Sequence, residues 1–186
     1  MASVRSPEYR IPQFQHLLAI SRSVAEIERE IAYKPASASD RRFVPIEEIL
    51  ERSNAHLHDI HLSFPVTIKR SRHNPGESYS TSVIPDAVYG IEYQEDTARV
   101  YRFFALEVER TSPLRRRSFK LTSTLKKLFA YQATIHSGSY MNALGVPNLF
   151  PHFVSRDEKH KFEMQNLASE VLSLEELKLF RFTCIP

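Results

Sequence analysis

Three carboxylate side chains stand out because of where they fall on two expected strands. Asp86 follows Pro85 and opens the first strand, and Glu107 and Glu109 close the next one about twenty residues later. If these strands are antiparallel neighbours, the three carboxylates meet at one end of a sheet. Unpaired carboxylates that close together repel one another and are costly to desolvate, so such a cluster usually holds a cation or basic side chains. Magnesium and manganese fit, because hard divalent ions prefer carboxylate oxygens.

Two strands must position this cluster. Residues 83–93 and 99–109 are rich in β-branched and aromatic side chains, which is typical of strands, and a polar turn lies between them. A hairpin with its turn near residue 96 puts Asp86 opposite about residue 106. The hairpin is the simplest arrangement that brings the aspartate towards the two glutamates.

The remaining elements predict an α/β fold in which a mixed central sheet is flanked by helices. The chain divides into an N-terminal arm (1–44), with one helix and a linker, and an α/β domain (45–186). The alternation of residues 60–68 supports a strand as well as the end of a helix that starts near residue 45. Pro65 disturbs either reading, and a helix through about residue 63 is favoured. Helices are expected at residues 24–33, 45–63, 118–136 and 156–168, a linker at 34–42, and further strands at 150–155 and 177–183.

A run of basic residues follows the acidic cluster directly. It spans residues 110–127 and contains no acidic side chain. A basic strip beside a cation-binding site suits a polyanion whose backbone is held while a phosphate is attacked, which predicts DNA as the partner. Such side chains grip phosphates without reading sequence. The strip consists of Arg110, Arg115, Arg116, Arg117, Lys120, Lys126 and Lys127.

Composition narrows the function classes. No apolar run is long enough to span a bilayer, and the first residues lack the apolar core of a signal peptide, so a cytoplasmic protein is expected. Only four glycines are present and none forms a phosphate-cradling loop, which argues against a nucleotide-driven motor. No Gly-x-Ser-x-Gly elbow is present either, so serine nucleophiles are not supported.

With Pro85-Asp86 and Glu107-Val-Glu109 on consecutive strands, the chain resembles the PD-(D/E)XK nuclease superfamily. It is most similar to the replication-relaxation proteins of plasmids and other mobile elements, in which a Pro-Asp strand leads to a Glu-x-Asp-Arg-like segment. The resemblance covers roughly residues 45–183 and implies an αβββαβ restriction-endonuclease-like core. It also implies metal-dependent phosphodiester hydrolysis. Asp86 and Glu107 would ligate magnesium or manganese, and the carbonyl of Val108 would add an oxygen.

The chain departs from the superfamily pattern at Glu109, where a lysine is usual. Many nucleases of the group carry Gln-x-x-x-Tyr on the following helix, and Lys127 and Tyr131 have the same spacing. Lys127 could therefore restore the missing positive charge, and it or Glu109 would assist proton transfer. Tyr131 would contact a phosphate or orient Lys127.

Other readings stay open. His56, His58 and His61 suggest a zinc site but lack a second ligand cluster, and partly exposed helix histidines are the simpler interpretation. In the superfamily the first helix often adds a metal-site residue, for which Glu51, His58 and Asp59 are candidates. Three functions are weighed: a DNA nuclease or nickase of mobile-element or phage replication, a nuclease-like DNA-binding or regulatory module without catalysis, and a protein-interaction domain with an acidic partner. Self-association is left open.

Overall fold

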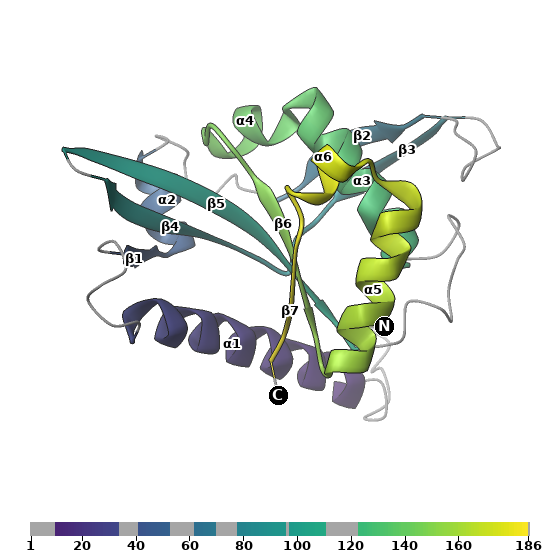
Figure 1. The fold of residues 1–186 in the computed structure, drawn as a ribbon, viewed down its shortest axis with the longest axis horizontal. Helices are drawn as coiled ribbons and strands as arrows, with labels where there is room; N and C mark the ends of the chain where they lie inside the picture. The colour runs from purple at the N-terminus through teal and green to yellow at the C-terminus, as the bar shows by residue number, and fades with distance from the viewer. Residues whose placement is uncertain are drawn as a thin grey trace, which may run out of the picture.

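The computed structural model describes residues 10–33, 41–52, 62–69, 78–95, 97–110 and 123–185. Within these ranges the chain forms a five-stranded mixed sheet flanked by helices, with a separate two-stranded sheet (Figure 1). The predicted α/β class with a mixed central sheet is therefore confirmed. The helices are α1 (Arg10–Ala32), α2 (Ile46–Arg52), α3 (Thr124–Ser137), α4 (Ser139–Leu144), α5 (Glu158–Val171) and α6 (Leu174–Leu177). The strands are β1 (Arg41–Val44), β2 (Phe64–Ile68), β3 (Tyr79–Val83), β4 (Ala87–Glu95), β5 (Ala98–Glu109), β6 (Phe150–Ser155) and β7 (Arg181–Cys184).

The central sheet has the order β1-β4-β5-β6-β7, with β2 and β3 paired apart from it. Strand β4 is antiparallel to β1 and to β5, whereas β5, β6 and β7 are parallel. The predicted hairpin is confirmed, because Ala87 pairs with Leu106 and the amide of Asp86 donates to the carbonyl of Leu106 at 2.9 Å. Asp86 thus stands at the carboxyl end of β5, beside the two glutamates.

Alternation along β5 sends side chains to two separate cores. Phe103 and Ala105 belong to the core that β2, β3 and α3 cover, and Phe104 and Leu106 belong to the core under α1. Figure 1 shows α1 lying across one face of the sheet, with α3 and α5 on the other side. Glu107 falls between Leu106 and Val108, both in the α1 core, so its side chain projects towards α3.

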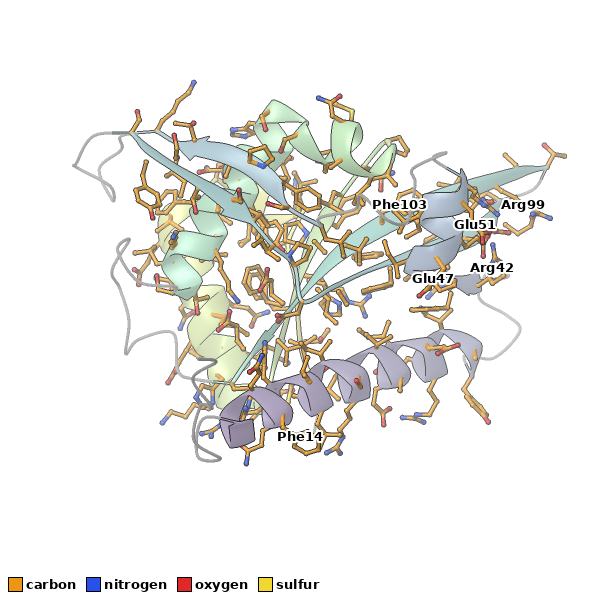
Figure 2. All side chains as sticks on the ribbon, turned by 180° about the vertical axis from the view of Figure 1, so that it is seen from behind. Phe14, Arg42, Glu47, Glu51, Arg99 and Phe103 are labelled. Carbon is orange, nitrogen blue, oxygen red and sulfur yellow. The ribbon has the colours of Figure 1, made fainter. Side chains whose placement is uncertain are left out.

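Helix α1 begins at Arg10, earlier than the predicted start at residue 24. Pro12 is accommodated because it lies in the first turn, where an amide hydrogen has no helical acceptor. The inner stripe of the helix packs on the sheet through Ile20, Val24, Ile27 and Ile31. Its outer face carries Phe14, which is 65% exposed and points away from the sheet (Figure 2).

Several predicted boundaries are wrong. The helix expected at 45–63 ends at Arg52 within the described residues, and β2 follows it, so the strand alternative holds for residues 64–68; residues 53–61 lie outside the described ranges. The strand expected from residue 83 begins at Ala87, because Ile84-Pro85-Asp86 separates it from β3.

Two further boundaries are those of α3 and β7. Ser123 caps α3 by accepting a hydrogen bond from the amide of Lys126, and the helix runs from Thr124; residues 118–122 of the predicted helix lie outside the described residues. It ends at Gly138, whose φ of 65° is left-handed, as its glycine predicted. The last strand starts at Arg181 because α6 and a turn occupy the preceding residues. Of the expected linker at 34–42, the described residues Arg41 and Arg42 belong to β1.

Candidate active site

Lys127 joins the two glutamates of β5. Its ammonium nitrogen lies 2.5 Å from Glu107 Oε2 and 2.6 Å from Glu109 Oε1. The two carboxylates are two residues apart on the strand and therefore share the face that α3 covers. The side chain of Glu107 is 2% exposed, that of Glu109 12% and that of Lys127 23%, so the pair of contacts is largely shielded from water.

Tyr131 holds the other oxygen of Glu107. Its hydroxyl donates to Glu107 Oε1 at 2.7 Å, and its fully buried ring packs edge-on against Phe153. Lys127 and Tyr131 lie one helical turn apart, so one face of α3 supplies both partners of a single carboxylate. The predicted spacing brings the two side chains together, and the contact that Tyr131 makes is with Glu107.

Asp86 uses its two oxygens differently. Oδ2 accepts from the amide of Val108 at 2.7 Å, and Oδ1 lies 3.1 Å from Nε2 of His16. The Asp86 carboxylate thus accepts the hydrogen bond of a β5 amide just before β4 begins at Ala87. Asp86 is only 16% exposed as a side chain, and α1 covers it through His16.

His16 is the site residue that sequence reasoning missed. The signal that points to it is the apolar stripe of Ile20, Val24, Ile27 and Ile31, because His16 lies one helical turn before Ile20 on the same face of α1. Of the first-helix candidates, Glu51 lies on α2 and is exposed (Figure 2). His58 and Asp59 lie outside the described residues, as do His56 and His61.

Burial and charge set the protonation of this cluster. Burial raises the pKa of Glu107 to about 7, against the charge of Lys127, which lowers it, and with the charge of Asp86, which raises it. Burial alone would lower the pKa of Lys127, but the charges of Glu107 and Glu109 outweigh burial and raise it. Burial likewise raises the pKa of Tyr131, and the neighbouring Glu107 raises it further. Glu107 and Glu109 both contact the ammonium of Lys127, and the raised pKa of Glu107 means that this carboxyl takes up a proton more readily than an ordinary glutamate.

The donor set suits a hard cation but is incomplete as it stands. In the part of the chain that the structure describes, no three His, Cys, Asp or Glu side chains are grouped to hold a metal. Both oxygens of Asp86 and both of Glu107 already have protein partners. Two carboxylates and the Val108 carbonyl are all-oxygen donors of the kind magnesium prefers. For a cation to bind Glu107, Lys127 must give up its contact with Glu107 and keep its contact with Glu109.

A small pocket of about 180 Å³ lies over Glu107. Strand β3 forms one wall and α3 the other, and Lys126 stands at its side with its nitrogen 3.3 Å from the hydroxyl of Tyr79 and 4.8 Å from the centre of that ring. The pocket gives Glu107 and Lys127 a route to a ligand. Its walls are Thr81, Ser82, Val83, Ile84, Lys126, Ala130 and Tyr131, with Glu107 and Lys127 between them.

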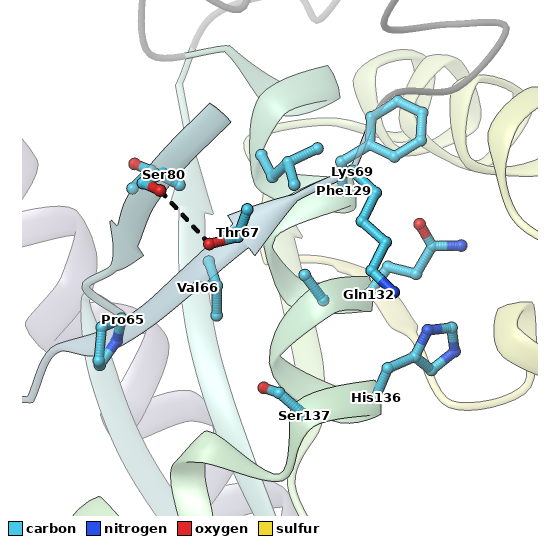
Figure 3. Close-up of a pocket in the computed structure, with 12 residues that line it drawn as sticks. Pro65, Val66, Thr67, Lys69, Ser80, Phe129, Gln132, His136 and Ser137 are labelled. Carbon is cyan, nitrogen blue, oxygen red and sulfur yellow. Dashed lines mark hydrogen bonds between the residues drawn. The ribbon is translucent and has the colours of Figure 1, made fainter. Parts of the chain in front are cut away.

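A larger hollow, of about 720 Å³, lies elsewhere in the molecule. It lies between β2 and the C-terminal half of α3, where Thr67 bonds to Ser80 and His136 projects from the helix (Figure 3). No carboxylate lines it, and His136 lies 3.1 Å from Glu176. Size alone therefore points away from the charged cluster, and the chemistry points to the smaller pocket.

Two of the predicted nucleic-acid-binding residues can be placed besides Lys127. Arg110, at the end of β5, donates to Gln15 of α1 at 2.7 Å, and Lys126 contacts Tyr79. The two lie on opposite sides of the carboxylate cluster. Arg115, Arg116, Arg117 and Lys120 lie outside the described residues.

Comparison of the chain with protein-family models, with curated proteins and with solved structures found no match. Among the described residues no helix combines the length and apolarity needed to cross a membrane. The case for a function therefore depends on the site itself.

Proposed function

We propose that this chain is a metal-dependent phosphodiesterase that cleaves or nicks DNA. The observation that carries the proposal is Glu107, a carboxylate with 2% exposure and a raised pKa at the base of a pocket. A buried carboxylate and its lysine seldom add stability compared with apolar side chains of similar volume. Perturbed ionisable groups in a pocket are instead typical of catalytic sites.

Asp86, Glu107 and the Val108 carbonyl would hold the magnesium or manganese ion. The bound ion would polarise the scissile phosphate and lower the pKa of a water molecule. Other groups of the protein would hold the two carboxylates in position. Val108 and His16 fix the carboxylate of Asp86 from two directions, and Tyr131 fixes Glu107 through one oxygen.

Lys127 takes the role of the lysine that the superfamily places at position 109. Its contact with Glu109 holds the ammonium beside the pocket, where it would stabilise negative charge on the phosphate. Glu109 is then a positioning residue for Lys127 and assists proton transfer through it. This assignment explains why a glutamate stands where a lysine is usual.

The arrangement of elements supports the resemblance to PD-(D/E)XK nucleases. Helix α1, the antiparallel strands β1, β4 and β5, helix α3 and the parallel strand β6 follow the order αβββαβ. In this correspondence the first helix is α1 and not the segment 45–63, and α2 with the β2–β3 pair is an insertion. A cytoplasmic role in the replication of a mobile element or phage follows from the resemblance alone.

A second candidate is a nuclease-like DNA-binding module without catalysis. It is favoured by the contact between Lys127 and Glu107, which occupies an oxygen that a cation would need, and by the lack of three grouped ligands among the described residues. The two candidates differ in a single respect, namely whether a cation displaces Lys127 from Glu107.

An assay with supercoiled plasmid distinguishes the nuclease from the DNA-binding module without catalysis. Wild-type protein with magnesium or manganese is expected to convert the plasmid to nicked or linear DNA, and EDTA is expected to stop the reaction. Asp86→Asn and Glu107→Gln should abolish nicking, while Glu28→Gln, an exposed carboxylate on α1, serves as the matched control. DNA retardation that persists in EDTA, without nicking under any metal, would support the second candidate and refute the first.

A further inference from the structure

A second hollow, of about 360 Å³, lies where β5 and β6 end against the first half of α1. Figure 1 shows β5, β6 and β7 converging on this helix. Ligands of open α/β sheets bind outside the carboxyl ends of parallel strands, and β5 and β6 are such a pair. The hollow therefore occupies the part of the sheet where a ligand is expected.

The floor of the hollow is apolar and its rim is cationic. Leu18, Val108, Val154 and Ile185 supply aliphatic surface, and Leu18 remains 58% exposed although it borders the hollow. Among the described residues that line the hollow, the charged ones are three arginines and one acid, Glu109. The arginines are Arg22, Arg110 and Arg156.

The single acid does not cancel this positive charge, because Glu109 is already paired with Lys127. Arg110 donates a hydrogen bond to the side chain of Gln15, and Arg156 donates one to Asp157 at 2.9 Å. Arg22 makes no contact with an acid among the residues that the structure places. An arginine guanidinium bonds a phosphate through two parallel hydrogen bonds, so a phosphoryl group is the anion that such a rim fits best.

The hollow and the candidate active site lie on opposite faces of the sheet at the end of β5. Glu109 belongs to the lining of the hollow, but its carboxylate contacts Lys127 on the α3 face, beside the small pocket over Glu107. A strand that places a phosphate at Glu107 would have to pass the end of β5 to bring a neighbouring nucleotide to the hollow. The volume is near the lower end of the range of about 300–1,000 Å³ for small-molecule pockets, which suits one nucleotide and not a duplex.

We propose that this hollow is a nucleotide subsite, in which a base rests on the aliphatic floor and a phosphate binds Arg22 and Arg156. The proposal deepens the proposed function, on which it rests for the identity of the strand. It commits to a phosphorylated nucleotide, and the nucleotide is either a unit of a single strand or free in solution. The same chemistry serves both sources.

Calorimetric titration in EDTA tests the subsite without cleavage. The probes are 5′-phosphorylated oligothymidylate, thymidine monophosphate, thymidine and inorganic phosphate. We expect the monophosphate to bind and thymidine to bind far more weakly, because the rim recognises the phosphate. Arg22→Gln and Arg156→Gln should each weaken the monophosphate by about tenfold or more, and Arg29→Gln, an exposed arginine farther along α1, should not.

Leu18→Ser distinguishes the contribution of the aliphatic floor to binding from that of the arginine rim. Because Leu18 is exposed, the change leaves the core intact, and it should weaken the monophosphate several-fold while inorganic phosphate is unaffected. An oligonucleotide that binds at least about tenfold more tightly than the monophosphate assigns the hollow to a strand, and equal affinities assign it to a free nucleotide. Affinities unchanged in both arginine variants would overturn the subsite.

This outcome is independent of nicking. If plasmid nicking fails but the arginine variants lose the monophosphate, the subsite stands and the catalytic proposal falls. If nicking occurs and the arginine variants bind every probe like the wild type, the catalytic proposal stands and the subsite falls.

Discussion

The hydroxyl of Tyr131 donates to Glu107 Oε1 at 2.7 Å, and neither side chain is more than 2% exposed. This bond fixes the orientation of the carboxylate that faces the pocket and ties α3 to the end of β5. It also accounts for part of the cost of burying Glu107, since a carboxylate removed from water needs a donor for each oxygen.

Tyr131→Phe tests that bond. The variant leaves Glu107 Oε1 buried without a donor, so we expect a loss of about 1–3 kcal/mol in the free energy of unfolding, measured by urea denaturation. Tyr140→Phe, at a buried tyrosine of α4 outside the cluster, is the control and should change stability less. Equal losses in both variants would show that the bond to Glu107 contributes nothing particular.

Lys127→Met should be more damaging. It removes the one ammonium that faces Glu107 and Glu109, and the expected loss is about 3 kcal/mol, typical of breaking a buried pair from one side. Adding Glu107→Gln to Lys127→Met should recover part of that loss. Lys126→Met, at the more peripheral neighbour, should cost less than about 1 kcal/mol. A double variant no more stable than the single one would contradict the coupling.

Asp86 allows its structural and chemical roles to be separated. Asp86→Asn keeps an oxygen that accepts from the Val108 amide, so stability should fall by less than about 1 kcal/mol while nicking is lost. Asp86→Ala orphans that amide and should cost about 1–3 kcal/mol more. Thermal melts at fixed pH distinguish the two variants. Retained nicking in Asp86→Asn would remove Asp86 from the catalytic site.

The stability of the protein below neutral pH depends on two buried groups with opposite signs. Burial lowers the pKa of His152 to about 3, and this ring bonds Tyr89 and Thr183. Its unfolded form binds a proton below the ordinary value of 6.5, so stability falls as pH falls through that range. Glu107 binds a proton in the folded state below about 7, so its contribution to stability grows as pH falls towards 4.5.

Between pH 4.5 and 6.5 the two contributions oppose each other, at about 1.4 kcal/mol per pH unit for each full proton. Removing either group should therefore expose the other. We expect His152→Gln, which keeps polar atoms for Tyr89 and Thr183, to become more stable as pH falls through this window. Glu107→Gln should become less stable. Urea denaturation at several pH values measures both slopes, and parallel slopes in the two variants would contradict the assigned protonation states.

The hairpin and the shared α3 face of Lys127 and Tyr131 could be predicted from the sequence because their signals are local. Alternating apolar residues mark β5, and the spacing of Lys127 and Tyr131 places both on one helical face. The boundary at Ala87 is harder to predict, because β3 and β4 are separated only by Ile84, Pro85 and a bend at Asp86. That bend is what leaves the Val108 amide to the side chain of Asp86.

The contribution of α1 could not be predicted, since His16 and Asp86 are 70 residues apart and meet only through tertiary packing. The same holds for the second hollow, whose arginines come from α1, from the end of β5 and from the end of β6. The contacts of Lys127 were equally hidden. A lysine four residues before a tyrosine does not reveal that it bonds two glutamates of another element.

The most direct test is manganese binding, measured by electron paramagnetic resonance on the wild type and on Glu107→Gln. We expect the wild type to bind Mn²⁺ at this site and Glu107→Gln to weaken binding by about tenfold or more. Lys127→Met should not weaken it, because the ammonium competes with the cation. Absence of binding to the wild type, or equal affinity in Glu107→Gln, would contradict the claim that the carboxylates of Asp86 and Glu107 form a catalytic metal site.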